Sequence, residues 1–387
     1  MEFNCHPDFV LTVILSERQM YKIVLFMFQI LTKKLLSLKM SAENNTLNII
    51  ETAHEDIIND AVLDYFGTTL ATASNDGKIK LFDVRNGQQR NIACLTDHTS
   101  PIWQLSWAHP SFGEVLASCS YDGDVIIYKK QNENWTMMYK VNLGKAANSI
   151  SWAPVEFGMI LAVGSADSNI HILSYNSHGN NWHHEKIQNA HSISVQSVSF
   201  APGNNPSSLF LDESQDQESK CLRLVSGGDD NEPKIWKYDN SSKSWENETC
   251  LEGHEDWIKD VAWAPNIGLP EEQIASCSTD HKVIIWSRNH LEIPSGKNSS
   301  DDILEQNIKR MWKSTVLPIQ DEVISHVSWS LTGGILACSG GADHVSLWKQ
   351  DLSGEWMRIS DGEHMENLKD RNDGASNNQD SVIAAET

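Results

Sequence analysis

The sequence predicts an all-β fold, a six-bladed propeller. Three observations carry this prediction. A unit of short strands recurs six times through the middle of the chain, its turns fall at a nearly regular interval, and the 14 tryptophans occupy matching places in the units. Because one four-stranded sheet cannot bury both of its faces alone, repeated sheets of this kind stack around an axis.

Each unit has the same order of elements. It opens with a His in most blades, continues with a strand ending in an aromatic residue, and then has a second strand of small and apolar residues. A tight turn at Asp leads to a third strand that usually closes on an aromatic residue. The predicted first strands end at Tyr65, Trp107, Trp152, Phe200, Trp263 and Trp329. The predicted third strands close on Phe82, Tyr128, Leu173, Trp236, Trp286 and Trp348.

The turn aspartates define the period of the repeat. They are Asp76, Asp122, Asp167, Asp230 and Asp280, which lie 46, 45, 63 and 50 residues apart. This spacing is close to the roughly 40–45 residues per blade of WD-repeat propellers. The pattern therefore predicts a WD-repeat propeller over residues 47–360.

A fourth strand completes each unit. Residues 90–95 form it in blade one, and the others open with or contain Trp135, Trp182, Trp245, Trp312 and Trp356. All six blades are thus filled in sequence order, so the spare strand candidate at 47–51 has no vacant place in blade six. We therefore expect an open ring, in which a partner covers the apolar faces of blades one and six and removes their cost in water.

A His, a Ser, the turn Asp and the closing aromatic residue resemble the structural tetrad of WD repeats. The predicted members are His54, Ser74 and Asp76 in blade one; His98, Ser120, Asp122 and Tyr128 in blade two; and His254, Ser278, Asp280 and Trp286 in blade five. A buried Asp–His–Ser set also has the composition of a hydrolase triad. Since a catalytic set is needed once and this one recurs, the sequence favours a structural role.

Strand alternation supplies candidate residues for the two faces of the gap. In blade one these are Val62, Leu70, Ile79 and Leu81, and in blade six they are Val327, Trp329, Leu336, Val345 and Leu347. Two further tryptophans, Trp103 and Trp257, lie in predicted loops before first strands. They are candidates either for exposed contact residues or for packing beneath the loops.

The composition limits the classes of function. The 30 Lys and Arg residues against 52 Asp and Glu residues give a net charge of −22, which argues against binding a nucleic-acid backbone or anionic lipid. The seven cysteines form no C-x-x-C motif, so neither a zinc site nor a disulfide framework is indicated. The chain also lacks phosphate-loop, nucleophile-elbow and H-E-x-x-H motifs. No catalytic residue, metal or cofactor is therefore predicted.

The two ends of the chain differ from the repeats. Residues 1–46 are predicted to be an extension that is disordered or dispensable, and the nearly apolar run at 23–31 is too short to span a bilayer. Residues 361–387 are polar and acidic, and we expect a disordered tail there.

The amino-acid sequence of the blades resembles that of one particular subfamily. The segments that carry the resemblance are 54–65, 107–113, 116–123, 234–238, 251–257 and 260–265, and they include non-tetrad positions such as Ala108-His109-Pro110. These segments are similar to the small WD-repeat subunit of the COPII vesicle outer coat. The resemblance runs from Leu47 to Ile359.

The resemblance implies an open six-bladed propeller without enzymatic activity. Its expected partner is the α-solenoid large subunit of the COPII outer coat, which inserts a β-blade of its own and completes the ring. The resemblance also implies a second partner, a solenoid subunit of the nuclear-pore Y-shaped scaffold, and a role in amino-acid signalling to TORC. Nucleic acid is not an expected partner, and membrane is contacted only peripherally through the coat.

The expected locations follow from the same resemblance. They are the cytoplasm, the cytosolic face of ER exit sites and COPII-coated vesicles, the nuclear envelope, and the lysosomal or vacuolar membrane. Two other classes of function compete with a scaffold. A substrate-recognition adaptor, for example of a ubiquitin ligase, would have a closed ring and an exposed pocket on one face. A propeller enzyme would have one non-repeated polar set at the central channel.

Overall fold

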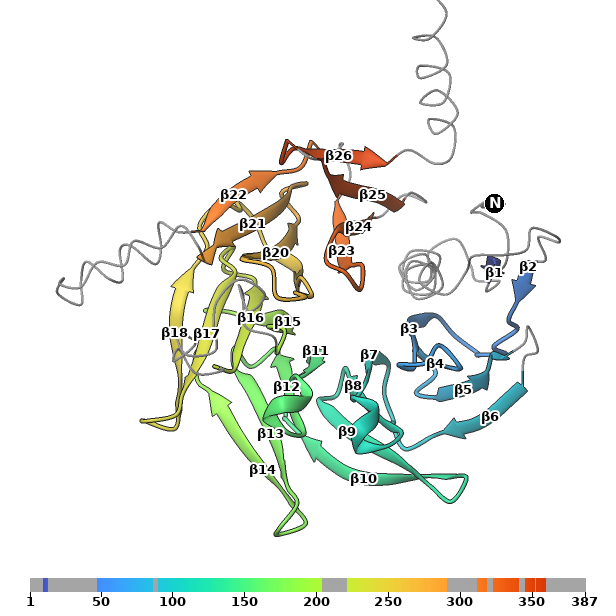
Figure 1. Cartoon of the computed structure of the whole chain (residues 1–387). Coiled ribbons are helices and arrows are strands. Elements are labelled where there is room, and N and C mark those ends of the chain that lie inside the picture. The colour runs from blue at the N-terminus through green and yellow to red at the C-terminus, as the bar shows by residue number, and fades with distance from the viewer. Residues whose placement is uncertain are drawn as a thin grey trace, which may run out of the picture.

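The structure is a computed structural model that describes residues 10–12, 47–85, 90–203, 221–290, 312–318, 323–340, 345–351 and 353–359. Six four-stranded antiparallel sheets form an incomplete ring, with blades one and six at its two ends (Figure 1). The predicted extension, apart from residues 10–12, and the predicted tail at 361–387 lie outside the described residues. The six-bladed propeller predicted from the repeats is confirmed.

Each blade is built from four strands that are consecutive in the sequence. Blade one contains β3 (Ile58–Leu63), β4 (Thr69–Ser74), β5 (Ile79–Asp83) and β6 (Arg90–Leu95). Blade two contains β7 (Ile102–Trp107), β8 (Val115–Ser120), β9 (Asp124–Gln131) and β10 (Asn134–Asn142). Blade three contains β11 (Ala147–Trp152), β12 (Ile160–Ser165), β13 (Ile170–Asn176) and β14 (Asn181–Ile187).

The second half of the ring follows the same plan. Blade four contains β15 (Val195–Phe200), β16 (Arg223–Gly228), β17 (Lys234–Asp239) and β18 (Ser244–Cys250). Blade five contains β19 (Ile258–Trp263), β20 (Glu271–Ser278), β21 (Val283–Asn289) and β22 (Lys313–Val316). Blade six contains β23 (Ile324–Trp329), β24 (Ile335–Gly340), β25 (Val345–Gln350) and β26 (Trp356–Ile359).

Few described elements lie outside the blades. Two short 3-10 helices, η2 (Pro110–Phe112) and η3 (Val155–Phe157), connect the first and second strands of blades two and three. Strand β1 (Val10–Thr12) pairs in parallel with β2 (Leu47–Ile49). Because blade six already has its four strands and β2 pairs elsewhere, the described chain contains no strand that joins the two ends of the ring.

Apolar side chains between neighbouring blades form the core. Five clusters lie between successive blades, from the one joining blades one and two to the one joining blades five and six. A sixth cluster lies on the face of blade one that points away from blade two, and includes Leu63, Leu70 and Phe82. Each blade therefore depends on its neighbour for burial of its apolar surface.

The inner strands are the innermost layer of the ring. They lie beside one another in the order β3, β7, β11, β15, β19 and β23, and no comparable contact joins β23 to β3 within the described residues. One edge of each inner strand faces the axis, where its N–H and C=O groups have no strand to pair with. Side chains from the neighbouring blade satisfy one or two of these groups at each junction.

A side-chain acceptor on each of the first five inner strands receives a backbone N–H from the next blade. The first case is Asp60, whose Oδ2 accepts the N–H of Leu105 at 2.8 Å. The second is Gln104, whose Oε1 accepts the N–H of Ile150 at 2.7 Å. The same bond recurs at the next three junctions, from Val198 to Ser149, from Val261 to Ser197 and from Val327 to Asp260. These bonds fix the position of each blade along the ring axis relative to the blade before it.

We predict that removing one acceptor of this series lowers stability. In Gln104→Met the buried N–H of Ile150 loses its partner while the shape of the side chain is nearly kept. The free energy of unfolding should fall by about 1–3 kcal/mol, measured by chemical denaturation. Gln104→Glu keeps an acceptor and is the control, so equal stability of the two variants would contradict the assignment.

Candidate functional site

The His–Asp pairs form polar clusters that recur from blade to blade in the described residues. In blade five, His254 Nδ1 lies 2.9 Å from Asp280 Oδ2, and His254 Nε2 lies 2.8 Å from the Ser276 hydroxyl. The indole N–H of Trp286 donates to the same hydroxyl at 2.9 Å. The ionised Asp280 carboxylate can only accept, so Nδ1 carries the proton, and in the neutral imidazole Nε2 accepts from the Ser276 hydroxyl.

The same set occurs in blades one and four. His54 bonds to Asp76 and to the hydroxyl of Thr72, each at 2.9 Å. In blade four, His191 bonds to Asp230 and Ser226, and Trp236 donates to the Ser226 hydroxyl.

The hydroxyl residues predicted from the sequence need correction. The histidines bond to Thr72, Ser118 and Ser276 rather than to Ser74, Ser120 and Ser278. Ser74 and Ser278 lie two residues further along, where each donates to a loop carbonyl and accepts the N–H of the turn aspartate. They brace the turn and do not contact the histidine.

Blade two departs further from the predicted set. His98 bonds to Ser118 at 2.7 Å, but its Nδ1 has no hydrogen-bond partner among the described residues. Asp122 accepts instead from the hydroxyls of Ser120 and Thr99. Tyr128 fills the position of the closing aromatic residue and is buried between blades one and two.

The electrostatics of these sets suit a structural role. Burial lowers the pKa of His254, despite the opposing effect of Asp280. Burial alone would raise the pKa of Asp280, but the Glu255 N–H and His254 hold it below its ordinary range. The carboxylate is therefore charged and the imidazole neutral near pH 7. The bonded hydroxyls of Ser226 and Ser276 are fully buried and out of reach of a substrate.

We predict that the two serines of blade five differ in their effect on stability. Ser276→Ala leaves the buried His254 and Trp286 without their shared partner, and should cost about 2–4 kcal/mol of unfolding free energy. Ser278→Ala, the control, loses its bonds to the Asp256 carbonyl and the Asp280 N–H but leaves His254 and Trp286 paired, and should cost about 1–2 kcal/mol. Chemical denaturation measures both, and a larger loss for Ser278→Ala would reverse the assignment.

We also predict acid-sensitive stability from blade two. Burial lowers the pKa of His98 from its ordinary value of 6.5 to about 4. Between these values the unfolded chain binds a proton that the folded chain does not, so the free energy of unfolding falls as the pH drops from 6.5 to 4. The loss from this one residue is at most about 3 kcal/mol.

Denaturation curves across that range test the prediction. His98→Gln should reduce the slope of unfolding free energy against pH by up to the equivalent of one bound proton. His183→Gln is the control, since the His183 side chain is 65% exposed and lacks the burial that acts on His98. An unchanged slope in His98→Gln would contradict the prediction.

The opening between blades one and six is the second candidate site, and its blade-six face is apolar. Leu336 and Trp348 pair across β24 and β25 and both pack toward blade five. The alternate residues Val345 and Leu347 therefore face the opening, where both are half-buried. Ile359 pairs with Leu347 and is 37% exposed, and Met357, two residues before it, is 56% exposed.

The blade-one face of the opening is already covered in part. Leu70 and Phe82 pair across β4 and β5 and pack with Ile50, which is 1% exposed. The Lys80 amine donates to the carbonyls of Thr52 and Ala53, which holds this segment across the face. The exposed apolar side chains described at the opening are thus those of blade six.

Six of the predicted gap residues lie elsewhere. Val62, Ile79 and Leu81 pack between blades one and two, and Val327, Trp329 and Leu336 pack against blade five. The reason is register: Leu70 pairs with Phe82, so Leu81 points to the opposite side of the sheet. Leu70, Val345 and Leu347 remain candidates. The sequence analysis did not include Phe82, Met357 and Ile359, although their alternating positions along the strands could have indicated that they face the opening.

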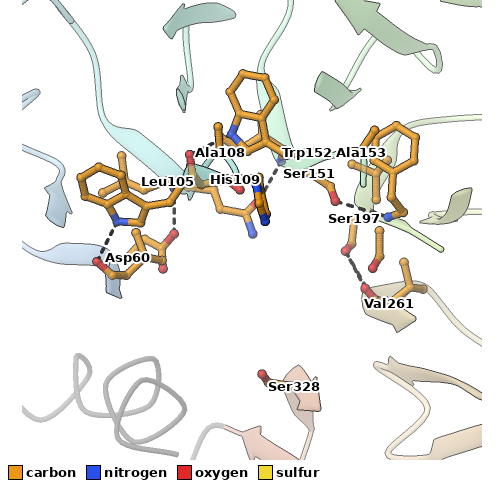
Figure 2. Close-up of a pocket in the computed structure, with 18 of the residues that line it drawn as sticks. Asp60, Leu105, Ala108, His109, Ser151, Trp152, Ala153, Ser197, Val261 and Ser328 are labelled. Atoms are coloured by element: carbon orange, nitrogen blue, oxygen red, sulfur yellow. Dashed lines mark hydrogen bonds between the residues drawn. The ribbon is translucent and has the colours of Figure 1, made fainter. Parts of the chain in front are cut away.

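A cavity of about 620 Å3 lies at the axis of the ring (Figure 2). It is lined by the inner strands, and its two carboxylates, Asp60 and Asp260, accept backbone N–H groups of the next blade. Figure 2 shows these bonds around Asp60 and Ser197, whereas Ser328 lies apart from them. The polar groups of the cavity thus belong largely to the repeated bonds between blades.

The two loop tryptophans have different surroundings. Trp257 is 48% exposed, and the Lys259 amine lies 5.8 Å from its ring centroid. Trp103 is part of β7, where it packs against the cluster between blades two and three. Only Trp257 is therefore available as an exposed contact residue.

The described residues offer neither a metal site nor a membrane-spanning helix. No group of three or more His, Cys, Asp or Glu side chains there is arranged to hold a metal ion. No helix in that part of the chain is long and apolar enough to cross a membrane.

Comparisons with known proteins agree with this geometry. The family model "WD domain, G-beta repeat" matches residues 45–83, 89–129 and 245–287, which correspond to blades one, two and five. A chain of the crystal structure of the mitotic checkpoint complex superposes with a TM-score of 0.55 at 16% identity, covering 77% of this chain and 76% of that one. The fold and the repeated sets define a WD-repeat propeller.

Curated relatives give a narrower assignment. The SEC13 homolog of Drosophila melanogaster is 42% identical over 316 residues, which cover 81% of this chain and 83% of the relative. Protein transport protein sec13 of Emericella nidulans is 39% identical, covering 81% and 97%. Protein transport protein SEC13 of Cryptococcus neoformans is 40% identical, covering 83% and 99%. The chain belongs to the SEC13 family of WD-repeat proteins.

Proposed function

We propose that the chain is a structural scaffold subunit of the COPII outer coat and supports ER-to-Golgi vesicle transport. The observation that carries the proposal is the open ring, in which six complete sheets leave an apolar face on blade six without a neighbouring blade. The names of the curated relatives, which are protein transport proteins, support the same reading.

The proposed partner is the α-solenoid large subunit of the outer coat, which contributes a β-blade to the opening. Apolar surface left in water costs roughly 25 cal/mol per Å2, and an inserted blade would cover Val345, Leu347 and Ile359 as the other blades cover one another. Such an insertion stiffens the junction between propeller and solenoid, so no enzymatic step belongs to the proposal.

The same opening accommodates other solenoids with a compatible blade. We include in the proposal a nuclear-pore Y-complex solenoid as second partner, and a role in amino-acid signalling to TORC. The corresponding locations are the cytosolic face of ER exit sites and COPII vesicles, the nuclear envelope, and the lysosomal or vacuolar membrane, with membrane contact only through the assembly.

A substrate-recognition adaptor is less well supported. Such an adaptor was expected to have a closed ring and an exposed pocket on one face, whereas this ring is open. The half-exposed Trp257 favours it.

Affinity purification of the tagged chain from its own cells tests the proposal. The wild-type chain should capture an α-solenoid coat subunit, and Leu347→Asp should reduce the captured amount at least tenfold, because a charge would be buried against the inserted blade. Ile193→Asp is the control, since Ile193 is 58% exposed and lies just before β15 in blade four, far along the ring from the opening. Equal capture by both variants would contradict the proposed binding surface.

A further inference from the structure

The inner strands carry a common four-residue unit, which we call the junction unit. Its members are a hydrogen-bonding polar residue, an apolar residue, a small residue and an aromatic residue. The complete units are residues 104–107, 149–152, 197–200, 260–263 and 326–329, and blade one has 60–63 with Val62 at the small position and Leu63 in place of the aromatic residue.

The residue at the first position of each unit is hydrogen-bonded to the residue at the second position in the next blade. At all five junctions its side chain accepts the backbone N–H of that second residue, at 2.7–3.3 Å. The residues that accept are Asp60, Gln104, Ser149, Ser197 and Asp260.

The third position of each unit meets the aromatic position of the next blade. At three junctions the indole N–H of Trp107, Trp152 or Trp329 donates to the carbonyl at the third position, at 3.0–3.2 Å. At the other two, the backbone N–H groups of Phe200 and Trp263 donate to the hydroxyls of Ser151 and Ser199. Every junction between consecutive blades thus has the same two points of attachment.

Blade six has the same two attachment groups, at the first and third positions of its junction unit. No described blade follows it to bond with them. Its first position is His326 and its third position is Ser328, and no described residue meets either with the equivalent bond. Blade one does not supply it, because no contact comparable to those between successive inner strands joins β23 to β3 within the described residues. In that part of the chain the two ends of the ring are therefore not attached in this way.

His326 has the chemistry that its position requires. Its Nδ1 lies 3.4 Å from Asp260 Oδ2, and its side chain is 31% exposed. With the proton on Nδ1 directed to Asp260, the lone pair of Nε2 is left to accept an N–H from outside the chain.

We propose that His326 and Ser328 are the groups by which blade six recognises the first strand of the inserted blade. This inference rests on the proposed function and adds the chemistry of the partner. The partner strand carries a junction unit of its own, whose second residue donates its backbone N–H to His326. The fourth residue of that unit, Trp or Phe, bonds to the carbonyl or hydroxyl of Ser328.

The test measures the affinity of the purified chain for the solenoid subunit that co-purifies with the wild type. His326→Leu removes the acceptor and should weaken binding roughly tenfold, the effect of one lost hydrogen bond of about 1.4 kcal/mol. His326→Gln restores an acceptor of the kind that Gln104 provides and should bind within about threefold of wild type. His109→Leu is the control, because His109 lines the same cavity away from the opening and should leave affinity unchanged.

The outcomes separate this inference from the proposed function. Capture of a solenoid by the wild type, with unchanged affinity in His326→Leu, overturns the inference and leaves the proposed function standing. Absence of any captured solenoid overturns both. The melting temperatures of the free variants show that a loss of binding is not a loss of fold. The captured subunit should also contain a junction unit, and replacing its aromatic residue by Leu should weaken binding by a similar factor.

Discussion

The two hydrogen bonds at each inner-strand junction are the constraint on which the rest of the ring depends. An inner strand has one edge directed at the axis, where no further strand fits. The acceptor side chains of one blade and the aromatic residues of the next satisfy that edge, as from Leu105 to Asp60 and from Trp107 to Val62. The same bonds fix the height of each blade on its neighbour, so that the apolar faces meet in register and a cluster forms between them.

The His–Asp sets act within the blades in a comparable way. They tie the loop before the first strand to the turn between the second and third, as His254 does through Asp280 and Ser276. Their composition is that of a hydrolase triad, yet the serine is fully buried and hydrogen-bonded to a tryptophan. Burial lowers the pKa of His54 and His254, so the stability that these two neutral histidines provide is present near pH 7 and is lost in acid.

The two terminal blades differ in the groups that they present at the opening. Blade one has Leu63 where complete junction units have an aromatic residue, and its outer face is partly covered by the segment containing Ile50. Blade six keeps a complete junction unit and half-exposed apolar residues on its outer face. This asymmetry means that the open end offers attachment groups mainly from blade six, which suits a partner that adds one blade in the same sense as the chain's own.

The sequence by itself determined the six repeats, the four strands of each and the open ring, because the spacing of turn aspartates and tryptophans counts strands directly. Tertiary structure decided which residues face which neighbour. Ser276 and Ser278 point to the same side of β20, so alternation cannot choose between them, and the path of the preceding loop places His254 beside Ser276. Likewise, Leu70 and Leu81 look equivalent in sequence, but the pairing of Leu70 with Phe82 puts them on opposite faces. Alternation gives the two sides of a strand, whereas only the register between strands decides which side meets the next blade.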